Sequence, residues 1–393
     1  MDRDVRPRVT YWTGVWAPGH EAISNEIACL RQASGRSWVV SCASHQRAGL
    51  DLLGRVLRVR PSAWPLLRMA AAGVERMGDV THVFGRLDEW HLLRATGHRP
   101  VVFTVAIDAP PLRESAWGRV CVFVAETEAL ARSLVRAGVS RSYVRVIHPG
   151  VNLRRYTPSA PPPTTPFRVL FASSPSRVEE FDARGIPLLV ETARRCPDTE
   201  IVLCWRNWGD GSAAERALRA LDPPANVRME RVGPGGMAAM YASVHAVVCA
   251  YAPGFGKSAP NSIIEGLACG RPALVTEDCG LASVIVRGGA GESVGRSSVD
   301  LSAGIDALRA SYHEYALAAR RLAESTFDAA RFCADYAGVY AELAGGAAPE
   351  VTARAATEIT GATGSPRSSG AADGLRAGSV FNSPTSNFQL PHS

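Results

Sequence analysis

This sequence of 393 residues lacks long apolar runs and paired cysteines, and each lack excludes a class of protein. No stretch of eighteen apolar residues occurs, so no transmembrane helix is predicted. The first residues, MDRDVRPRVT, contain no apolar segment of the signal-peptide type, and we expect a cytoplasmic protein. Nine cysteines are scattered without a CxxC pair or a Cys/His cluster, which argues against a disulfide framework and a structural zinc site.

Lysine is also nearly absent, since Lys257 stands alone against 42 arginines, and the net charge is +6. This modest positive balance suits nucleotides, anionic lipid surfaces or nucleic acid. No basic stripe with interleaved aromatic residues occurs, which disfavours nucleic acid as a partner. Residues 54–77 mix arginines with apolar side chains. That mixture fits packing on a sheet, and it also leaves open a peripheral contact with the inner face of a membrane.

The first half of the chain alternates short apolar runs with helical patterns. A helix is expected to begin near His20, with Ile23, Ile27 and Leu30 on one face. The candidate strands are residues 8–13, 37–42, 80–84, 101–105, 120–124 and 143–147. Strands separated by helices indicate βαβ units and a parallel sheet.

A proline cluster, TPSAPPPTTP, follows this first series and reads as a semi-rigid linker. A second series has a helix stripe at 186–193 and strands that are apolar on both faces, at 168–172, 201–205, 246–250 and 273–276. The expected parts are an N-terminal Rossmann-like domain (1–157), the linker (158–166), a C-terminal Rossmann-like domain (167–325), a C-terminal helix (326–345) and a disordered tail (346–393). Ligands of such domains bind in the cleft, at the carboxyl ends of strands.

The segment GFGKSAPNSIIEGLACGRPALVTEDCG, residues 254–280, is the most informative for chemistry. Pro260 predicts a helix start that Asn261 or Ser262 can cap. A helix N-terminus at a cleft offers amide groups and a positive dipole end, which suit a diphosphate. Glu265, one turn further on, is placed to accept hydrogen bonds from ribose hydroxyls, although a solvated helix residue fits the same spacing.

The string PNSIIEGLACGRPALV resembles the signature of retaining glycosyltransferase family 4, where a Glu-x7-Glu motif ends in P-N-x-x-x-E-A-x-A-x-G-x-P-V-V. VIHPGVNLRRYTP (146–158) is similar to the phrase that ends the family's first domain. FRVLFAS followed by Arg184-Gly185 resembles the opening of its second domain, and NVRMERVG (226–233) resembles a later strand. Pro18-Gly19-His20-Glu21 stands where the first domain has a glycine-rich turn. The resemblance implies a GT-B fold of two Rossmann-like domains facing a central cleft.

The resemblance also implies roles, position by position. The catalytic candidates are Lys257, Arg184 at the diphosphate and Glu265 at the donor ribose. The further donor-binding candidates are Gly19, Arg206, Asn261, the backbone amides of Ser262 and Ile263, and the sugar-pocket residues Gly280 and Leu281. Apart from the resemblance, Arg86 and Asp88 follow the third expected strand, and with His20 and Asp108 they are the acceptor-side candidates. No metal and no cofactor are expected, because the nucleotide diphosphate sugar is itself the substrate.

Three positions depart from the family's pattern. The first Glu of the motif is replaced by Lys257, and a frequent histidine after the strand VVFTV is replaced by Ala106. The usual arginine before the basic-Gly pair has no clear counterpart, and Arg177 or Arg206 can substitute. Lys257 is either a chance surface residue of a loop or a functional cation. As a cation it would favour a carboxylate-bearing sugar such as a uronic acid, or add charge at the diphosphate.

The expected activity is glycosyl transfer from a nucleotide diphosphate sugar to a glycan, lipid-linked or small-molecule acceptor held by the N-terminal domain. Arginines and a helix dipole can neutralise the leaving group without metal, and the resemblance implies retention of configuration. Asp2-Arg3-Asp4 has the D-x-D spacing of metal-dependent transferases, but it precedes the first strand. Two alternatives stay open: a non-catalytic nucleotide-sugar-binding or partner-binding protein, and a nucleotide-sugar epimerase on the same fold.

Overall fold

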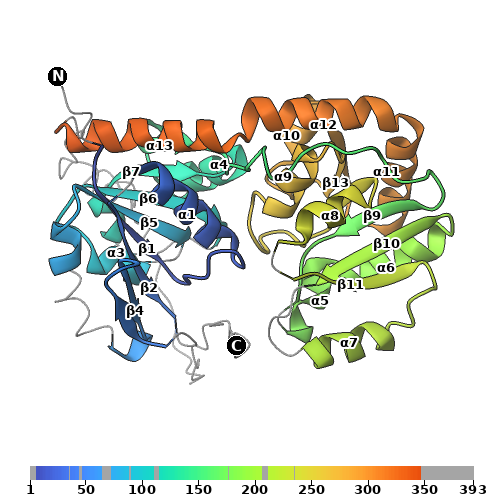
Figure 1. Cartoon of the computed structure of the whole chain (residues 1–393), viewed down its shortest axis with the longest axis horizontal. Helices are drawn as coiled ribbons and strands as arrows, with labels where there is room; N and C mark the ends of the chain where they lie inside the picture. Colours follow the sequence, from blue (N-terminus) through green and yellow to red (C-terminus); the bar gives the residue numbers. More distant parts are fainter. Residues whose placement is uncertain are drawn as a thin grey trace, which may run out of the picture.

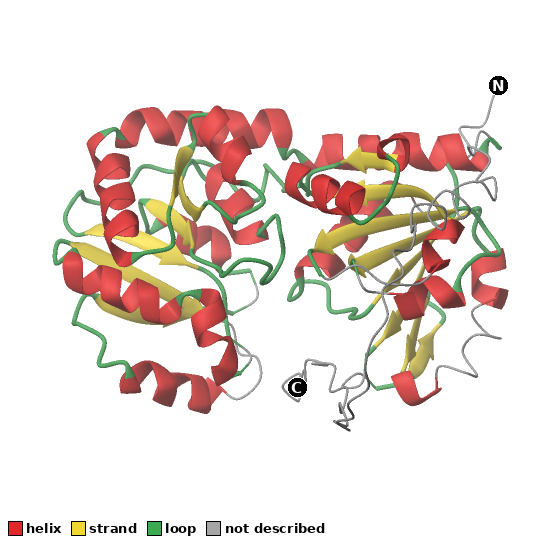
Figure 2. Ribbon diagram, turned by 180° about the vertical axis from the view of Figure 1, so that it is seen from behind, coloured by secondary structure: helices red, strands yellow, loops and turns green. Residues whose placement is uncertain are grey.

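A computed structural model shows two lobes side by side, each built on a β-sheet with helices packed against it (Figure 1, Figure 2). The structure describes residues 6–34, 36–43, 47–63, 72–87, 90–109, 115–175, 177–205, 211–233 and 235–346. The expected tail beyond Gly346 and the D-x-D segment lie outside these residues. Within them, no helix is both long and apolar enough to cross a membrane.

The N-lobe sheet has the strand order β3-β4-β2-β1-β5-β6-β7-β8, and only the edge strand β3 is antiparallel to its neighbour. Its strands are β1 (Val9–Thr13), β2 (Trp38–Cys42), β3 (Gly49–Asp51), β4 (Val56–Val59), β5 (Val80–Arg86), β6 (Val101–Ile107), β7 (Val120–Ala125) and β8 (Val144–Val146). After the central β1, the next strands are added on one side of it, as far as β4 and the edge strand β3. The chain then returns to place β5 on the other side of β1, and the later strands follow in that direction as far as β8. The reversal between β1 and β5 is the switch point at which such sheets leave a crevice for ligands.

The C-lobe sheet is wholly parallel, in the order β11-β10-β9-β12-β13-β14. Its strands are β9 (Phe167–Phe171), β10 (Thr199–Trp205), β11 (Val227–Arg231), β12 (Ala246–Cys249), β13 (Ala273–Thr276) and β14 (Gly291–Val294). The inner strands are buried on both faces, because helices cover each side of the sheet.

Helices cover both faces of each sheet. The N-lobe helices are α1 (Ala22–Ser34), α3 (Trp90–Ala95) and α4 (Glu128–Arg136). The C-lobe helices are α5 (Phe181–Arg184), α6 (Ile186–Arg195), α7 (Gly211–Ala220), α8 (Met237–Ala242), α9 (Asn261–Ala268), α10 (Ala282–Arg287), α11 (Ser298–Ala310) and α12 (Tyr312–Thr326). The last helix, α13 (Ala329–Ala344), follows α12 and lies along the N-lobe (Figure 1).

The return of α13 to the N-lobe links the end of the described chain to its beginning. Its buried face joins the core formed by α1 and the N-lobe sheet. The hydroxyl of Tyr340 lies 2.6 Å from Nδ1 of the buried His82, and that of Tyr336 lies 2.8 Å from the hydroxyl of Thr104. Each fully buried apolar or aromatic side chain of this kind contributes about 1.5–3 kcal/mol. The helix is therefore an integral part of the N-lobe core, although the C-lobe precedes it in the chain.

The expected α/β class with two parallel sheets is confirmed, and all ten expected strands are present with ends that agree within two residues. Three strands were not expected, β3, β4 and β14, and β11 was indicated only by the resemblance. These strands are short and lie at or near sheet edges, where β3 is fully exposed and β14 is mostly half-buried. Such strands carry no continuous apolar run, so their pattern does not differ from that of a loop.

Candidate active site

A cavity of about 480 Å³ lies between the lobes, at the carboxyl ends of strands from both sheets. Its N-lobe wall comes from the segments after β1 and β5 and from the first turn of α1. Its C-lobe wall comes from the segment after β9, from α5, and from the first turns of α9 with the loop before it. Strand ends and helix N-termini converge here, as they do at ligand sites of parallel sheets. The volume is in the range of small-molecule sites.

Glu265 lines this cavity from the second turn of α9. Ile263, Ile264 and Leu267 pack into the C-lobe core, and the helical period turns Glu265 away from them. Its Oε2 accepts a hydrogen bond of 2.9 Å from the hydroxyl of Tyr241. That bond orients the carboxylate, which as an acceptor-only group can take more than one donor.

The start of α9 differs from the expectation in one respect. The prediction that Asn261 or Ser262 caps the helix is wrong, because Pro260 is the N-cap and makes no side-chain cap bond. Oδ1 of Asn261 instead accepts a bond of 3.0 Å from Nζ of Lys257. Asn261 and Ser262 both line the cavity, so the positive end of the α9 dipole faces it. The side chain of Ile263 is fully buried, and its amide donates to the carbonyl of Pro260.

Arg184 enters the cavity from the end of α5. Its Nη2 lies 2.7 Å from Oε2 of Glu180, its Nη1 donates to Oγ of Ser173, and its guanidinium lies 5.3 Å from the ring centre of Phe255. The next residue, Gly185, has φ of +77°, and a Cβ there would lie 2.3 Å from the carbonyl oxygen of Ala250. Only glycine adopts this backbone conformation so close to Ala250. The Arg184-Gly185 pair therefore fixes the position from which the Arg184 side chain extends into the cavity.

Lys257 is buried between the lobes. Its side chain is only 10 % exposed, which excludes a solvent-exposed loop lysine. Nζ lies 2.7 Å from Oε1 of Glu26 on α1 and 2.7 Å from Oε2 of Glu126, which follows β7. It also donates to Asn261 and, at 3.3 Å, to the carbonyl of Ala259. Burial alone would lower the pKa of Lys257, but the attraction of Glu126 and Glu26 outweighs it and raises the pKa, so the ammonium stays charged.

Solved structures share this fold of two lobes. A glycosyltransferase from Rickettsia africae superposes with a TM-score of 0.67 at 15 % identity, covering 86 % of this chain and 98 % of that one. HepE of Anabaena in complex with UDP gives 0.68 at 16 % identity, and sucrose-phosphate synthase of Thermosynechococcus elongatus gives 0.68 at 13 %; each match covers 86 % of this chain and 100 % of the other. The chain has the GT-B fold. No family model and no curated protein matches the sequence.

On the N-lobe side of the GT-B cleft, His20 and Arg86 line the cavity together with Glu21. The Glu21 carboxylate accepts hydrogen bonds from the amides of Ile23 (3.0 Å) and Ser24 (2.6 Å). It therefore caps the first turn of α1, whose N-terminus points into the cleft. Burial raises the pKa of Glu21 above its usual value, against the lowering effect of these bonds.

The other predicted residues are distributed around the cleft. Gly19 has φ of +86° and donates its amide to Oδ1 of Asn25, which lines the cavity, whereas Gly19 itself does not. Gly280 and Asp108 line a second cavity of about 70 Å³ that shares Lys257 with the first. Leu281 is fully buried in the C-lobe core and lines neither cavity. Arg206 and Asp88 lie outside the described residues.

The sequence analysis did not identify Glu26 and Glu126, although the sequence pattern marks both positions as unusual for a carboxylate. Glu26 occupies the i+3 position of the stripe formed by Ile23, Ile27 and Leu30, where an apolar residue is expected. Glu126 directly follows the apolar strand β7, at the edge where parallel sheets bind ligands. A carboxylate at a buried position is rarely left without a partner. This rule could have identified Glu26 and Glu126 as residues with a buried partner. In the described part of the chain, no group of three His, Cys, Asp or Glu residues is arranged to hold a metal.

Proposed function

We propose that this protein transfers a glycosyl group from a nucleotide diphosphate sugar to an acceptor held by the N-lobe, with retention of configuration and without metal. One observation carries the proposal: Glu265, the N-terminus of α9 and Arg184 face the same cavity between the two lobes. Together they present an acceptor for ribose hydroxyls, a positive dipole end and a guanidinium for a diphosphate. The fold supports this assignment, since the similar HepE structure was solved with UDP and also with UDP-glucose.

The chemistry requires stabilisation of the negative charge that develops on the leaving diphosphate. Arg184 and the α9 dipole supply it from fixed positions, and fixed dipoles in an enclosed site act without reorganisation cost. The salt bridge from Arg184 to Glu180 engages one edge of the guanidinium, which has five N–H donors in all. An acceptor hydroxyl would approach from the N-lobe wall, past His20 and Arg86.

Lys257 lies between this diphosphate site and the smaller cavity at Gly280. An ammonium has three protons, and four oxygens already surround this one. Two of these oxygens belong to carboxyl groups, so a carboxylate-bearing sugar would add negative charge where it is already in surplus. We propose that Lys257 influences the choice of the sugar, rather than of the nucleotide base, by holding the loop before α9 that lines both cavities.

A thermal-shift screen against UDP-, GDP-, ADP- and TDP-sugars tests the proposal, because a ligand that binds only the folded state raises the melting temperature. We expect one base to stabilise the wild type and to lose most of that effect in Glu265→Gln. Turnover of that donor with and without acceptor then separates transfer from epimerisation and from binding alone. No stabilisation by any donor would refute the proposal.

A further inference from the structure

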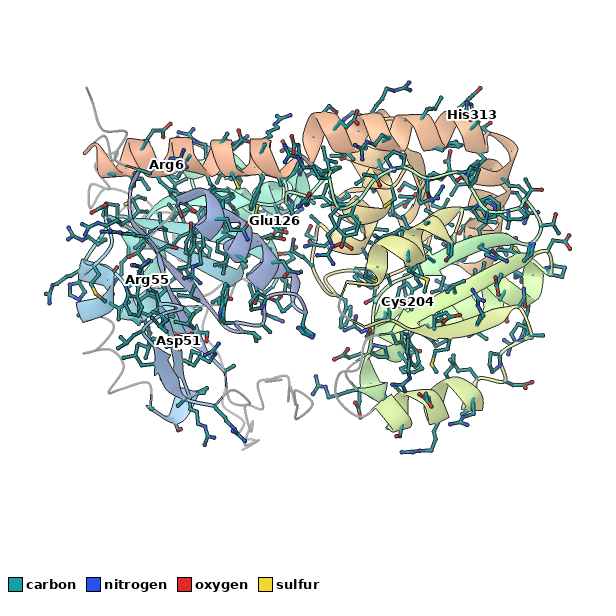
Figure 3. The ribbon with its side chains drawn as sticks, viewed as in Figure 1. Arg6, Asp51, Arg55, Glu126, Cys204 and His313 are labelled. Atoms are coloured by element: carbon teal, nitrogen blue, oxygen red, sulfur yellow. The ribbon has the colours of Figure 1, made fainter. Side chains whose placement is uncertain are left out.

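The contact between the lobes contains a cluster of three buried charged groups: Glu26, Glu126 and Lys257. The two glutamates belong to the N-lobe and are 2 % exposed, and the lysine belongs to the C-lobe. Figure 3 shows Glu126 on the side of the N-lobe that faces the C-lobe. Each carboxyl group lies 2.7 Å from the ammonium, so the cluster is a direct ionic link across the cleft.

Backbone contacts beside this cluster hold the same loop against the N-lobe. The amide of Ser258 donates 2.9 Å to the carbonyl of Ala106 at the end of β6, and its hydroxyl lies 2.9 Å from that of Thr127. Gly280 is packed so closely here that a Cβ would lie 2.7 Å from the Ser258 carbonyl oxygen. The loop before α9, which forms a wall of the donor cavity, is thus placed by the N-lobe as well as by its own lobe.

The charges of the cluster do not balance if both glutamates are ionised. Two carboxylates would face one ammonium, and a surplus negative charge would stay buried, which is strongly unfavourable. Oε2 of Glu26 and both carboxyl oxygens of Glu126 are buried and have no hydrogen-bond partner among the described residues, although Oε2 of Glu126 lies 2.7 Å from Nζ of Lys257. A single proton held between the two carboxyl groups neutralises the surplus charge and gives Oε2 of Glu26 and one oxygen of Glu126 a partner.

We propose that Glu26 and Glu126 are positioning residues of the donor site, which clasp Lys257 across the cleft and share one proton while the lobes are closed. The clasp itself follows from these contacts, whereas its effect on the donor rests on the proposed function. Burial, the neighbouring Glu26 and a hydrogen bond with it raise the pKa of Glu126 well above its usual value, although Lys257 opposes this. The two carboxyl groups titrate as a coupled pair, so the proton belongs to the pair.

This arrangement couples closure of the cleft to pH. Opening would expose Glu126 to water and return its pKa toward the ordinary value, so the open form releases a proton. The closed form is then fully favoured below the ordinary pKa of a glutamate and is progressively disfavoured as the pH rises toward the raised pKa of Glu126. One proton changes the closure equilibrium by at most about tenfold per pH unit.

Other titratable groups face the cluster from α1 and the residue before it, from α13 and from the segment after β8. Glu21 and Cys29 interact electrostatically with Glu26, and Tyr336 with both glutamates. The ring of His148 lies 2.8 Å from the carbonyl oxygen of Glu126, and burial lowers the pKa of this histidine, which keeps it neutral at pH 7. Cys29 is the group among these whose titration most needs a control, because its pKa is lowered by a hydrogen bond from Cys333.

The test measures closure by small-angle X-ray scattering of the full chain between pH 5 and pH 9, without donor. The variants are Glu126→Gln and Glu26→Gln, each of which leaves one carboxylate opposite Lys257, and the double variant Glu26→Gln/Glu126→Gln, which leaves none. Cys29→Ser controls for the thiol, and Glu191→Gln controls for loss of a half-exposed carboxylate in the C-lobe. Titration with UDP at pH 6 and pH 9 provides the donor-side measurement.

We expect the radius of gyration of the wild type and of both controls to increase with pH. Each single Gln variant should stay closed at every pH, with UDP affinity that no longer varies, because one carboxylate still balances Lys257. The double variant, which leaves the buried ammonium without a carboxylate, should be more open throughout. The proposal is overturned if either single variant keeps the pH dependence of the wild type, or if the double variant is as closed as the single ones. Should the double variant fail to fold, the comparison of the single variants with the wild type still decides. Absence of UDP binding with the expected scattering would refute the proposed function and leave the clasp standing.

Discussion

Two of the cations that line the cavity, Arg184 and Lys257, are held in opposite ways. Arg184 is paired with Glu180 four residues earlier, in its own lobe, and its side chain is 18 % exposed. Lys257 is paired with two carboxyl groups of the other lobe, each 2 % exposed. A partner within one helical turn persists whatever the lobes do, whereas partners across the cleft exist only while the lobes are together. The first cation is suited to receive a ligand, and the second to join the lobes.

The largest effect is expected at Lys257, since its removal leaves two buried carboxyl groups without a cation. Lys257→Met should lower the free energy of unfolding by about 3–5 kcal/mol, the usual result of breaking a buried pair. Denaturant unfolding followed by tryptophan fluorescence measures it. Asp335→Asn, which breaks an exposed pair with Arg331, is the control and should change stability by less than about 0.5 kcal/mol. Equal effects of the two variants would contradict the description of Lys257 as a buried link.

Catalysis should respond to the same lysine. Lys257→Ala is expected to reduce transferase activity by about tenfold or more, or about 1.4 kcal/mol of transition-state stabilisation. Because this variant also lacks the clasp, its nucleoside diphosphate affinity should match that of the wild type at high pH. Steady-state kinetics over a donor panel, together with calorimetry, separate the two quantities. Wild-type turnover by a folded Lys257→Ala protein would remove the lysine from the sugar side of the site.

Glu265→Gln should have an effect of similar size, on binding alone. Loss of charge-assisted hydrogen bonds to the ribose weakens nucleotide affinity by about 1.5–3 kcal/mol. The amide is nearly isosteric and can still accept from Tyr241, so the melting temperature should not change. Calorimetric titration with the preferred nucleotide measures the loss. An unchanged dissociation constant would show that Glu265 is a helix residue without a ligand role.

Arg184→Gln should weaken diphosphate affinity by about 1.5 kcal/mol, at the lower end for a charge-assisted bond, because Glu180 already occupies part of the guanidinium. Affinities for nucleoside monophosphate and diphosphate, compared by calorimetry, isolate the second phosphate. Arg219→Gln is a matched control, as Arg219 is also paired with a glutamate one turn away but is exposed on α7. If both variants bind the diphosphate like wild type, Arg184 does not contact it.

The smallest effect is expected from metal removal. With Arg184 and the α9 dipole neutralising the leaving group, activity with the identified donor should be unchanged by EDTA. Assays with EDTA and with added magnesium or manganese provide the measurement. Complete loss that either metal restores would require a different account of leaving-group stabilisation.

The accuracy of the sequence analysis varied with the kind of signal. Buried parallel strands such as β9 and β12 were located within two residues, because strands buried on both faces need continuous apolar runs. The edge strands β3 and β14 lack such runs and were missed. Glu265 and Arg184 line one cavity, as expected from the motif. Each position depends on local helix or turn geometry, which a short sequence pattern can predict.

By itself, the sequence determined the two parallel sheets, the helix that presents Glu265 and the position of Lys257 eight residues before it. These features depend on periodicities of two and 3.6 residues, which act over short stretches of chain. Only the tertiary structure decided that α13 completes the N-lobe core and that Lys257 meets Glu26 and Glu126. Those contacts join residues more than 100 positions apart, and no local pattern encodes which buried charge another buried charge will meet when two lobes close.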